Sequence, residues 1–555
     1  MSTTIPTQIE KCIGAMLATA IGDALGWPNE PRSKNRVKNL KVSDQFIEWT
    51  RICSNPRYHD ERILPGEYSD DTQMTLSVAR SIIAGDWEHF LAEKELPFWL
   101  KYERGGGGAI LKAAKSISEK KILLWQSNYT RDYFNAGGNG AAMRILPHVI
   151  AAAKKPDIQT LMLDVIKDTL ITHGHPRAFL GATCYAYALD YLLRKETVLE
   201  YGELVSAVID GQKAWGMSFL NLEIFGRWLE TANLYCGFDF VREWDAIFSN
   251  MVRQFDFIKT SLKKGLMIDD YAVLTQLECF SKANGAGDVA ALASIYLASR
   301  YANNPTLGIK IPAFSFGVDT DTIASITGGL LGMLSGTNWI PTEWKIVQDY
   351  DCLVQIAEVL YSDNKKEAAK VKTTEIKSKN NGWKISPIGA IRQIDSRQVP
   401  NGQNGFVVIT KWLTVLGQTI YTKEFDDRRQ TRQPNGQMQL DMQPTDNNSM
   451  PVQPTIQQTT VPKTGQSKPA QQAVEQKQFR LTNTIINALL AKSEFKQTKT
   501  VGKIFKVIQA LIEDQNSPEV ISKQFNVDLA MVELLQGLID NWENEVVEFK
   551  HTSND

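Results

Sequence analysis

Residues 12–26 read CIGAMLATAIGDALG, an apolar stretch in which a small residue recurs at every fourth position. These small residues are Gly14, Ala18, Gly22 and Gly26. Residues four apart share one face of a helix, so this face carries almost no side chain and another helix can approach its backbone closely. Each glycine costs about 1 kcal/mol relative to alanine, and close packing has to compensate for that cost. We therefore predict a central, buried helix here.

A second stretch of the same character is IASITGGLLGMLSG at residues 323–336. Around these two stretches, from Ile9 to about Asp363, apolar runs of helical period alternate with short loops rich in Gly, Asn and Pro. Few runs show the alternation of strands. We predict a compact all-α domain at residues 1–363.

The composition changes beyond this domain. A Lys-rich polar joint at residues 364–381 leads to strand-like alternation in GFVVIT at 405–410 and QTIYT at 418–422. This pattern predicts a small β-rich appendage at residues 364–427. Residues 428–478 are dominated by Gln, Pro, Thr, Asn and Ser, and such a segment cannot bury enough apolar surface to fold. We predict that it is a disordered linker.

Helical periodicity returns in residues 479–555, which predicts a small helical module. Ser517 and Pro518 match an N-cap and a first-turn proline. Residues 517–538 could also form the helix-turn-helix of a regulator. However, residues 479–550 hold 8 Lys and Arg against 10 Asp and Glu, so the basic surface of a DNA reader is missing. We expect docking to a protein partner, and the flexible linker would keep the first domain close to that partner.

The composition gives no sign of a charged partner or of an oxidising compartment. Lys and Arg number 61 against 62 Asp and Glu, a net charge of -1, so no global field attracts nucleic acid or an anionic membrane. The six cysteines are scattered and form no CxxC pair, which indicates buried free thiols in a reducing compartment. The first ten residues are polar, and no uncharged apolar run reaches the ~20 residues that span a bilayer. We expect no signal peptide, no membrane span and a cytoplasmic location.

Two acidic clusters each precede an apolar helix of small residues: SDDT at 69–72 and DTDT at 319–322. Either cluster alone is typical of helix capping, since Ser, Thr and Asp favour the N-cap and carboxylates are stabilised near a helix N-terminus. Together they supply carboxylate and hydroxyl oxygens, the hard ligands that suit Mg²⁺ and Mn²⁺. If the clusters face one another, they could hold two ions about 3.5 to 4 Å apart.

Two glycine-rich loops form a second constellation: RGGGGA at 104–109 and AGGNGAAMR at 136–144. Backbone N–H groups of such loops can approach an anion, and a helix N-terminus favours negative charge, so both could bind a diphosphate. Either loop could equally be a flexible turn. A further motif, THGHP at 172–176, has the spacing of a metal-ligand pair, but it has no nearby Cys and no third His at helical spacing. We expect it to hydrogen-bond a polar substrate instead.

In their order along the chain, these motifs resemble those of the ADP-ribosylglycohydrolase family, which includes the dinitrogenase-reductase-activating glycohydrolase. The likeness spans roughly residues 9–360, and the paired SDDT and DTDT motifs are its most specific part. It runs through GDALGWPNE at 22–30, YSDDTQM at 68–74, RGGGGA, GGNGAAMR, THGHP and GVDTDTIASITGGLLG at 317–332. The resemblance implies an orthogonal all-α fold with two Mg²⁺ or Mn²⁺ ions at the base of an ADP-ribose cleft.

The resemblance also implies roles for individual residues. The metal ligands would be Ser69, Asp70, Asp71, Asp319, Asp321 and Thr322, with Thr320 as a spacer. Glu30 would activate water or gate the site, and Asp71 and Asp321 would be catalytic with it. The diphosphate and the distal ribose would contact Gly105, Gly106, Gly107, Gly108, Gly138, Asn139, Gly140 and Met143. His173 would line the pocket beside that ribose.

These roles imply metal-dependent hydrolysis of the bond between ADP-ribose and a modified protein side chain, so the expected partner is an ADP-ribosylated protein. Breaking a bond at the ribose anomeric carbon develops oxocarbenium character. Ions that grip the ribose hydroxyl groups would orient the sugar, and a water of lowered pKa would attack. The alternative is a non-catalytic ADP-ribose-binding or structural member of the same fold. Such a protein is expected to lose metal carboxylates, and both acidic clusters here are intact.

Two departures from the family pattern limit what the resemblance implies. Ser69 stands where many relatives have Thr, which keeps the hydroxyl oxygen. Residues 215–311 match poorly, although NGAGD at 284–288 could correspond to a family glycine turn. Loops in this region normally shape the selection of the leaving group. The linkage that is cleaved therefore stays open, and arginine is the expectation by analogy.

Overall fold

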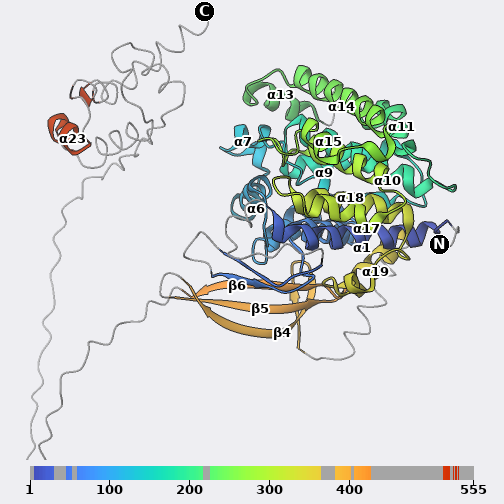
Figure 1. Cartoon of the computed structure of the whole chain (residues 1–555). Helices are drawn as coiled ribbons and strands as arrows, with labels where there is room; N and C mark the ends of the chain where they lie inside the picture. The colour runs from blue at the N-terminus through green and yellow to red at the C-terminus, as the bar shows by residue number, and fades with distance from the viewer. Residues whose placement is uncertain are drawn as a thin grey trace, which may run out of the picture. The chain divides into compact units, whose positions relative to one another are not determined.

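The computed structural model describes residues 5–30, 45–52, 59–216, 225–363, 382–401, 405–426 and 517–525, and the single residues 529, 532, 533 and 536. The chain divides into two compact units, Met1–Gln437 and Met438–Asp555. The first unit is mainly helical (Figure 1), which confirms the predicted all-α class of the first domain. Within the described residues, no helix combines the length and the apolar character that a membrane crossing requires.

The longer helices of the first unit are α1 (Gln8–Gly26), α3 (Asp70–Ala84), α6 (Gly108–Lys120), α9 (Ile158–Thr172), α10 (Pro176–Arg194), α11 (Glu203–Asp210), α13 (Gly226–Tyr235), α14 (Phe240–Leu262), α15 (Asp270–Gln276), α16 (Gly287–Arg300), α17 (Pro305–Ala313), α18 (Thr320–Ser335) and α19 (Tyr350–Tyr361). Shorter helical pieces connect them, among them η1 (Trp27–Asn29), α4 (Trp87–Phe90), α5 (Leu96–Trp99), α7 (Thr130–Phe134), η4 (Ala142–Arg144), α8 (Leu146–Ala151) and α12 (Gln212–Trp215). Helices far from the site begin at ordinary caps: the Thr7 side chain caps α1, and Asp157 caps α9.

Helices α1 and α18 pack backbone against backbone, and the predicted close approach to the first glycine stripe is confirmed. A Cβ atom on Gly22 would lie 2.2 Å from the carbonyl oxygen of Ala324, and one on Gly332 would lie 2.2 Å from that of Gly14. Only glycine allows such contact. The two helices run antiparallel, so α1 ends where α18 begins, and the Thr320 hydroxyl donates to the Gly26 carbonyl at 2.8 Å. Figure 1 shows the pair in the middle of the helical layer.

The core around this pair is continuous and holds the cysteines. Buried side chains of α10, α16, α17 and α19 join those of α1 and α18 in one apolar cluster. Cysteines 12, 184, 236 and 279 are free and buried, as expected for structural thiols. Cys352 is buried as well, and Cys53 lies outside the described residues. Burial raises the pKa of the Cys12 thiol to about 12, so this cysteine is inert at neutral pH.

One hairpin departs from the all-α prediction for the first domain. Strands β1 (Trp49–Arg51) and β2 (Glu61–Ile63) pair antiparallel, with Trp49 opposite Ile63. Each strand has three residues, too few to show an alternating pattern in the sequence. The Trp49 ring packs edge-on against Trp27 at 5.1 Å. The hairpin therefore lies against the end of α1, next to the first acidic cluster.

A four-stranded antiparallel sheet follows the helices, in the order β3-β4-β5-β6. Its strands are β3 (Trp383–Ser386), β4 (Gly389–Pro400), β5 (Phe406–Thr414) and β6 (Thr419–Asp426), with a register shift between Gln393 and Asp395. The strands expected at residues 405–410 and 418–422 are confirmed within β5 and β6. The sheet falls in the same compact unit as the helices, and Figure 1 shows it beside α1 and α19.

The second unit is described only in part. Helix α23 (Pro518–Phe525) begins where the Ser517 and Pro518 pattern predicts. The backbone N–H of Val520 donates to the Ser517 carbonyl at 3.0 Å. The predicted linker at 428–478 and most of the predicted module at 479–555 lie outside the described residues, so these assignments stay predictions.

Candidate active site

The site begins with an acid on the central helix. Asp23, fully buried near the end of α1, accepts hydrogen bonds from the Ser69 N–H at 3.0 Å and from the N–H and hydroxyl of Thr72 at 3.0 and 2.6 Å. Burial raises the pKa of Asp23, although these donors oppose the shift. A side chain of α1 therefore orients the first turn of α3. The sequence offered a signal for this residue, because Asp23 is an acid inside an apolar stretch.

The first acidic cluster opens helix α3. Ser69 is the N-cap, and its hydroxyl accepts from the Asp71 N–H at 3.3 Å. Asp70 and Asp71 occupy the first turn and are both buried. The capping interpretation is thus correct for Ser69, but it does not account for the two carboxylates that follow.

The second acidic cluster opens helix α18 and meets the first. Asp319 stands at the N-cap but makes no capping hydrogen bond with its side chain; it accepts from the Asn139 side chain at 2.9 Å instead. The Thr322 hydroxyl donates to Asp71 Oδ2 at 3.4 Å across a sequence separation of 251. The condition on which the metal hypothesis depends, that the two clusters face one another, is met.

The clusters lie at a pocket of about 410 Å³. Its lining consists of Glu30, Asp70, Asp71, Gly105, Gly107, Gly108, Ala109, Ile110, Gly138, Asn139, Gly140, Met143, His173, Asn284, Gly285, Asp319, Asp321 and Thr322. Most of the predicted site residues are therefore gathered around one cavity. Two are not in its lining: Ser69 is fully buried, and Gly106 packs against the Trp99 ring while its N–H donates to Glu103 at 3.1 Å.

The first glycine loop lies directly against the first acidic cluster. Gly105 has a φ of +100°, and a Cβ atom there would lie 2.9 Å from Asp70 Oδ1, so both conformation and space require glycine. Added Cβ atoms on Gly107 and Gly108 would meet nothing within 4 Å. These two residues present open backbone to the pocket at the start of α6, the arrangement expected for an anion-binding loop.

The second glycine loop is held by the turn before α16. The Asn139 N–H donates to the Gly285 carbonyl at 2.9 Å, and the Gly287 N–H donates to the Gly137 carbonyl at 3.0 Å. Asn284 and Gly285 line the pocket, although neither was among the predicted site residues. Their signal was the glycine turn at 284–288, which lies in the stretch that matched the family poorly.

His173 lines the pocket as predicted, and a buried network lies behind it. The Thr172 hydroxyl accepts from the Arg144 guanidinium at 3.0 Å and lies 2.7 Å from His173 Nδ1. If the hydroxyl donates to Nδ1, the ring proton is on Nε2. Nε2 faces the Gly138 loop, so in that tautomer the ring is a donor toward the pocket. Burial and the charge of Arg144 lower the pKa of His173 to about 3, which keeps it neutral.

Arg144 is itself locked in place. It donates to Asp168 Oδ1 at 2.7 Å, and the other carboxylate oxygen lies 3.0 Å from His148 Nε2. The second histidine of THGHP acts elsewhere, since His175 caps α10 by accepting from the Arg177 N–H at 3.3 Å. His173 and His175 therefore do not converge as a metal-ligand pair.

The sequence around this pocket is shared with a family of known proteins. The sequence profile of ADP-ribosylglycohydrolases matches residues 4–369. The chain belongs to the ADP-ribosylglycohydrolase family. The matched region contains every residue of the pocket lining and ends before strand β3.

Individual members of the family share less than a third of their residues with this chain over the matched regions. ADP-ribosylarginine hydrolase Tri1 of Serratia proteamaculans (strain 568) is 27% identical over 193 residues, 34% of this chain and 48% of that protein. The ADP-ribosyl-[dinitrogen reductase] glycohydrolase of Rhodospirillum rubrum is 29% identical over 174 residues, 31% of this chain and 54% of that protein. The matches thus span about half of the length of these two relatives. ADP-ribosylhydrolase ARH3 of Xenopus tropicalis is 23% identical over 351 residues, 60% of this chain and 89% of that protein.

The electrostatics of this ADP-ribosylglycohydrolase-family site are dominated by acids. Burial raises the pKa of Asp70, Asp71 and Asp321 well above the ordinary value, and neighbouring carboxylates raise each further. None of the described residues that line the pocket is Lys or Arg. Asp71 Oδ1 is buried and has no hydrogen-bond partner among the described residues. The cluster is short of positive charge.

Across the described ranges, no group of three or more His, Cys, Asp or Glu side chains stands in an arrangement that could hold a metal ion. The predicted ligand set also includes the hydroxyl groups of Ser69 and Thr322. The donor chemistry and the orphan oxygen of Asp71 nevertheless fit a divalent ion.

Proposed function

We propose that this chain is a metal-dependent hydrolase that removes ADP-ribose from a modified protein side chain. The observation that carries the proposal is the contact between Thr322 and Asp71, which joins the two acidic clusters at the glycine-walled pocket. Membership of the ADP-ribosylglycohydrolase family supports the same activity. The buried free cysteines suit a reducing compartment, and we extend the proposal to the cytoplasm.

The proposed cofactor is a pair of Mg²⁺ or Mn²⁺ ions. Their ligands would come from Ser69, Asp70, Asp71, Asp319, Asp321 and Thr322, with small side-chain movements that draw the carboxylates together. When bound, such ions supply positive charge that orients sugar hydroxyl groups and favours deprotonation of water. Asn139 would hold Asp319 in place, and Asp23 would hold the turn that carries Asp70 and Asp71.

The pocket walls would bind the rest of the substrate. The open backbone of Gly107 and Gly108, at the N-terminus of α6, would approach the diphosphate, because N–H groups and the helix dipole favour an anion there. His173 would donate its Nε2 proton to a ribose hydroxyl group. Since Thr172 and Arg144 hold the ring neutral and oriented, this donor needs no reorganisation when the substrate arrives.

Glu30 is the proposed general base. It follows η1 and lines the pocket near Asp321, whose pKa it helps to raise. In the proposed step a water oxygen bonds to the ribose anomeric carbon while the bond to the leaving nitrogen or oxygen breaks. The water proton passes to Glu30, the leaving group takes up a proton from solvent as it departs, and Glu30 then returns its proton to solvent. Removal of the base typically lowers such a rate by about 10² to 10⁴.

Arginine is the proposed linkage. The name of the Serratia proteamaculans relative assigns that protein to ADP-ribosylarginine, and we carry the preference over as a hypothesis. The decisive experiment supplies the full chain with Mg²⁺ or Mn²⁺ and with arginine-, serine- and nucleobase-linked ADP-ribose, and measures the ADP-ribose released. We expect metal-dependent release from the arginine conjugate. Release from another conjugate alone would overturn the arginine assignment, while the proposal that the chain is a hydrolase would still stand.

A non-catalytic ADP-ribose reader is the alternative function. It would bind free ADP-ribose in a metal-dependent way, measured by calorimetry, without release from any conjugate. That pair of results would overturn the hydrolase proposal. The intact acidic clusters favour turnover, because simple binding does not require this density of carboxylates.

A further inference from the structure

Strand β6 of the C-terminal sheet contacts the segments that lead into the pocket. The Lys423 N–H donates to the Lys101 carbonyl at 2.9 Å. Its ammonium group donates to the Glu103 carbonyl at 3.3 Å and to Glu61 at 3.0 Å. Residues 101–103 run directly into Arg104 and the first glycine loop. One lysine of the sheet therefore holds both the hairpin β1–β2 and the start of that loop.

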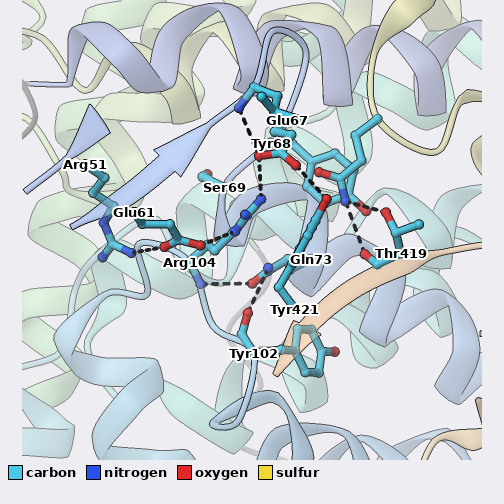
Figure 2. Close-up of polar contacts among 12 residues, drawn as sticks. Arg51, Glu61, Glu67, Tyr68, Ser69, Gln73, Tyr102, Arg104, Thr419 and Tyr421 are labelled. Carbon is cyan, nitrogen blue, oxygen red and sulfur yellow. Dashed lines mark hydrogen bonds and ion pairs between the residues drawn. The ribbon is translucent and has the colours of Figure 1, made fainter. Parts of the chain in front are cut away.

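Arg104 lies at the centre of the same buried network (Figure 2). Its guanidinium donates to Glu61 at 2.8 Å and to Glu67 at 3.1 Å. The Tyr421 ring of β6 stacks on it at 4.3 Å, and the Tyr421 hydroxyl donates to Glu67 at 2.8 Å. Since Arg104 precedes Gly105, and Glu67 lies two residues before Ser69, β6 closes a link between the glycine loop and the first acidic cluster.

The first residue of β6 and the turn before it make a second attachment to the acidic cluster. Thr419 donates through its N–H at 2.9 Å and its hydroxyl at 2.8 Å to Asp349, which also accepts from the Tyr68 hydroxyl at 2.7 Å. Tyr68 directly precedes Ser69. The buried Gln418 side chain accepts from Arg80 of α3 and donates to Tyr68 at 3.4 Å. The start of α3 and its third turn are thus both tied to the sheet.

Apolar packing reinforces these polar links. Ile388, Ile391 and Ile420 of the sheet region are buried in one cluster with residues of α3, α5 and α6. That cluster includes Ile110 and Met143, which line the pocket. Displacement of the sheet would expose this cluster and would disturb two walls of the cavity at once.

We propose that the β3–β6 sheet is a working part of the site, and that Tyr421 and Lys423 are positioning residues which hold the glycine loop against Asp70. The family profile ends at residue 369, before the sheet begins, so this support lies outside the region that the family match covers. Gly105 packs closely against the Asp70 side chain. A shift of its loop would therefore misplace both the backbone proposed to bind the diphosphate and a proposed metal ligand. The kinetic part of this inference rests on the proposed function.

The test uses the full chain carrying Tyr421→Phe or Lys423→Met, with Tyr201→Phe and Lys384→Met at exposed positions as matched controls. Hydrogen–deuterium exchange is followed in peptides covering residues 66–75 and 101–109. We expect roughly tenfold faster exchange in both peptides for the β6 variants, since each loses a partly buried hydrogen bond to a carboxylate. Exchange unchanged from the controls would overturn the proposal.

A kinetic arm separates positioning from general stability. With the conjugate that wild type cleaves, we expect kcat to fall about tenfold for Lys423→Met with a smaller change in KM, and Lys423→Arg to restore most of it. A lowered thermal midpoint with unchanged kcat would identify a structural role alone and overturn the proposal. If wild type cleaves no conjugate, the proposed function fails, while the exchange arm still decides the role of the sheet. Tyr421→Phe removes one hydroxyl group, so it keeps the test informative if Lys423→Met fails to fold.

Discussion

Two groups of buried acids lie side by side in this protein, one around Arg104 and one at the pocket. They differ in whether positive charge from the chain neutralises their carboxylates. Around Arg104, burial alone would raise the pKa of Glu61, but Lys423, Arg104 and Arg51 hold it below its usual range. At the pocket, burial and neighbouring carboxylates both raise the pKa of Asp71 and Asp321. The first group carries its own cations, whereas among the described lining residues the second has none.

The difference shows what each group is built for. Burying a charge is costly unless a partner of opposite sign is buried with it. The Arg104 network meets that condition within the chain, so it can serve as a rigid support. The described residues that line the acidic pocket supply no such partner, and under the proposed function a divalent cation would supply it. Substitutions that alter one group at a time test this contrast.

The largest effect is expected at the acidic pocket. Asp321→Ala should abolish turnover and weaken Mn²⁺ binding, because it removes a proposed metal ligand and the positioning of the sugar with it. Turnover is measured as ADP-ribose release, and Mn²⁺ binding by calorimetry. Asp351→Ala, at an exposed position in the first turn of α19, is the matched control and should behave as wild type. Activity of Asp321→Ala equal to that of its control would refute the ligand assignment.

Glu30 belongs to the same pocket but is proposed to act on water rather than on metal. Glu30→Ala should lower kcat by about 10² to 10⁴ while Mn²⁺ binding stays close to that of wild type. The same two measurements separate the roles, with the exposed Glu119→Ala as control. If Mn²⁺ affinity collapsed together with kcat, Glu30 would have to be counted among the ligands instead.

The Arg104 network is tested by measuring the free energy of unfolding. Glu61→Gln leaves Arg104 and Lys423 without their shared carboxylate, and breaking a buried pair in this way typically costs about 3 to 5 kcal/mol. Urea unfolding followed by tryptophan fluorescence measures the change. Glu48→Gln removes the acid of the exposed pair with Arg62 and should leave the midpoint near that of wild type. Equal shifts for both variants would contradict the contrast.

Metal addition should supply the charge that the pocket lacks. At a free Mn²⁺ concentration about 100 times the Kd, linkage predicts a stabilisation of about 2.7 kcal/mol. Thermal unfolding with and without Mn²⁺, reversed by a chelator, measures it in wild type and in Asp321→Ala. The effect should be reduced strongly in the variant, and an equal increase in both proteins would place the ion elsewhere.

The smallest effect is expected where the buried ion pair of Arg144 and Asp168 adjoins the pocket. Thr172→Val removes the hydroxyl group that links Arg144 to His173, so the imidazole loses its hydrogen-bond partner at Nδ1. We expect kcat/KM to fall about tenfold, the value of one buried hydrogen bond to a charged or oriented partner. The control is Thr260→Val, which removes an exposed hydroxyl on α14. Nitrogen NMR shifts of His173 report the tautomer, and an unchanged Nε2–H form would contradict the derivation.

Local pattern predicted much of this molecule because its physical causes are local. The glycine stripe of α1 and the strands near residues 405 and 418 follow from side-chain periodicity, and the cap at Ser517 follows from helix-end chemistry. The hairpin β1–β2 escaped prediction because three-residue strands show no period. Asp23 and Arg144 were passed over, since a buried acid or guanidinium is recognised as a positioning group only when its partners are known.

The chain alone indicated which residue types line the pocket: acids ahead of two helices, glycines in two loops and a histidine after a threonine. Which of them meet was decided only in three dimensions. The antiparallel packing of α1 and α18 brings Asp321 and Thr322 to Asp71, and β6 reaches back to Arg104. Such contacts depend on backbone approach and on charge balance between segments hundreds of residues apart, and neither quantity is contained in any one stretch of sequence.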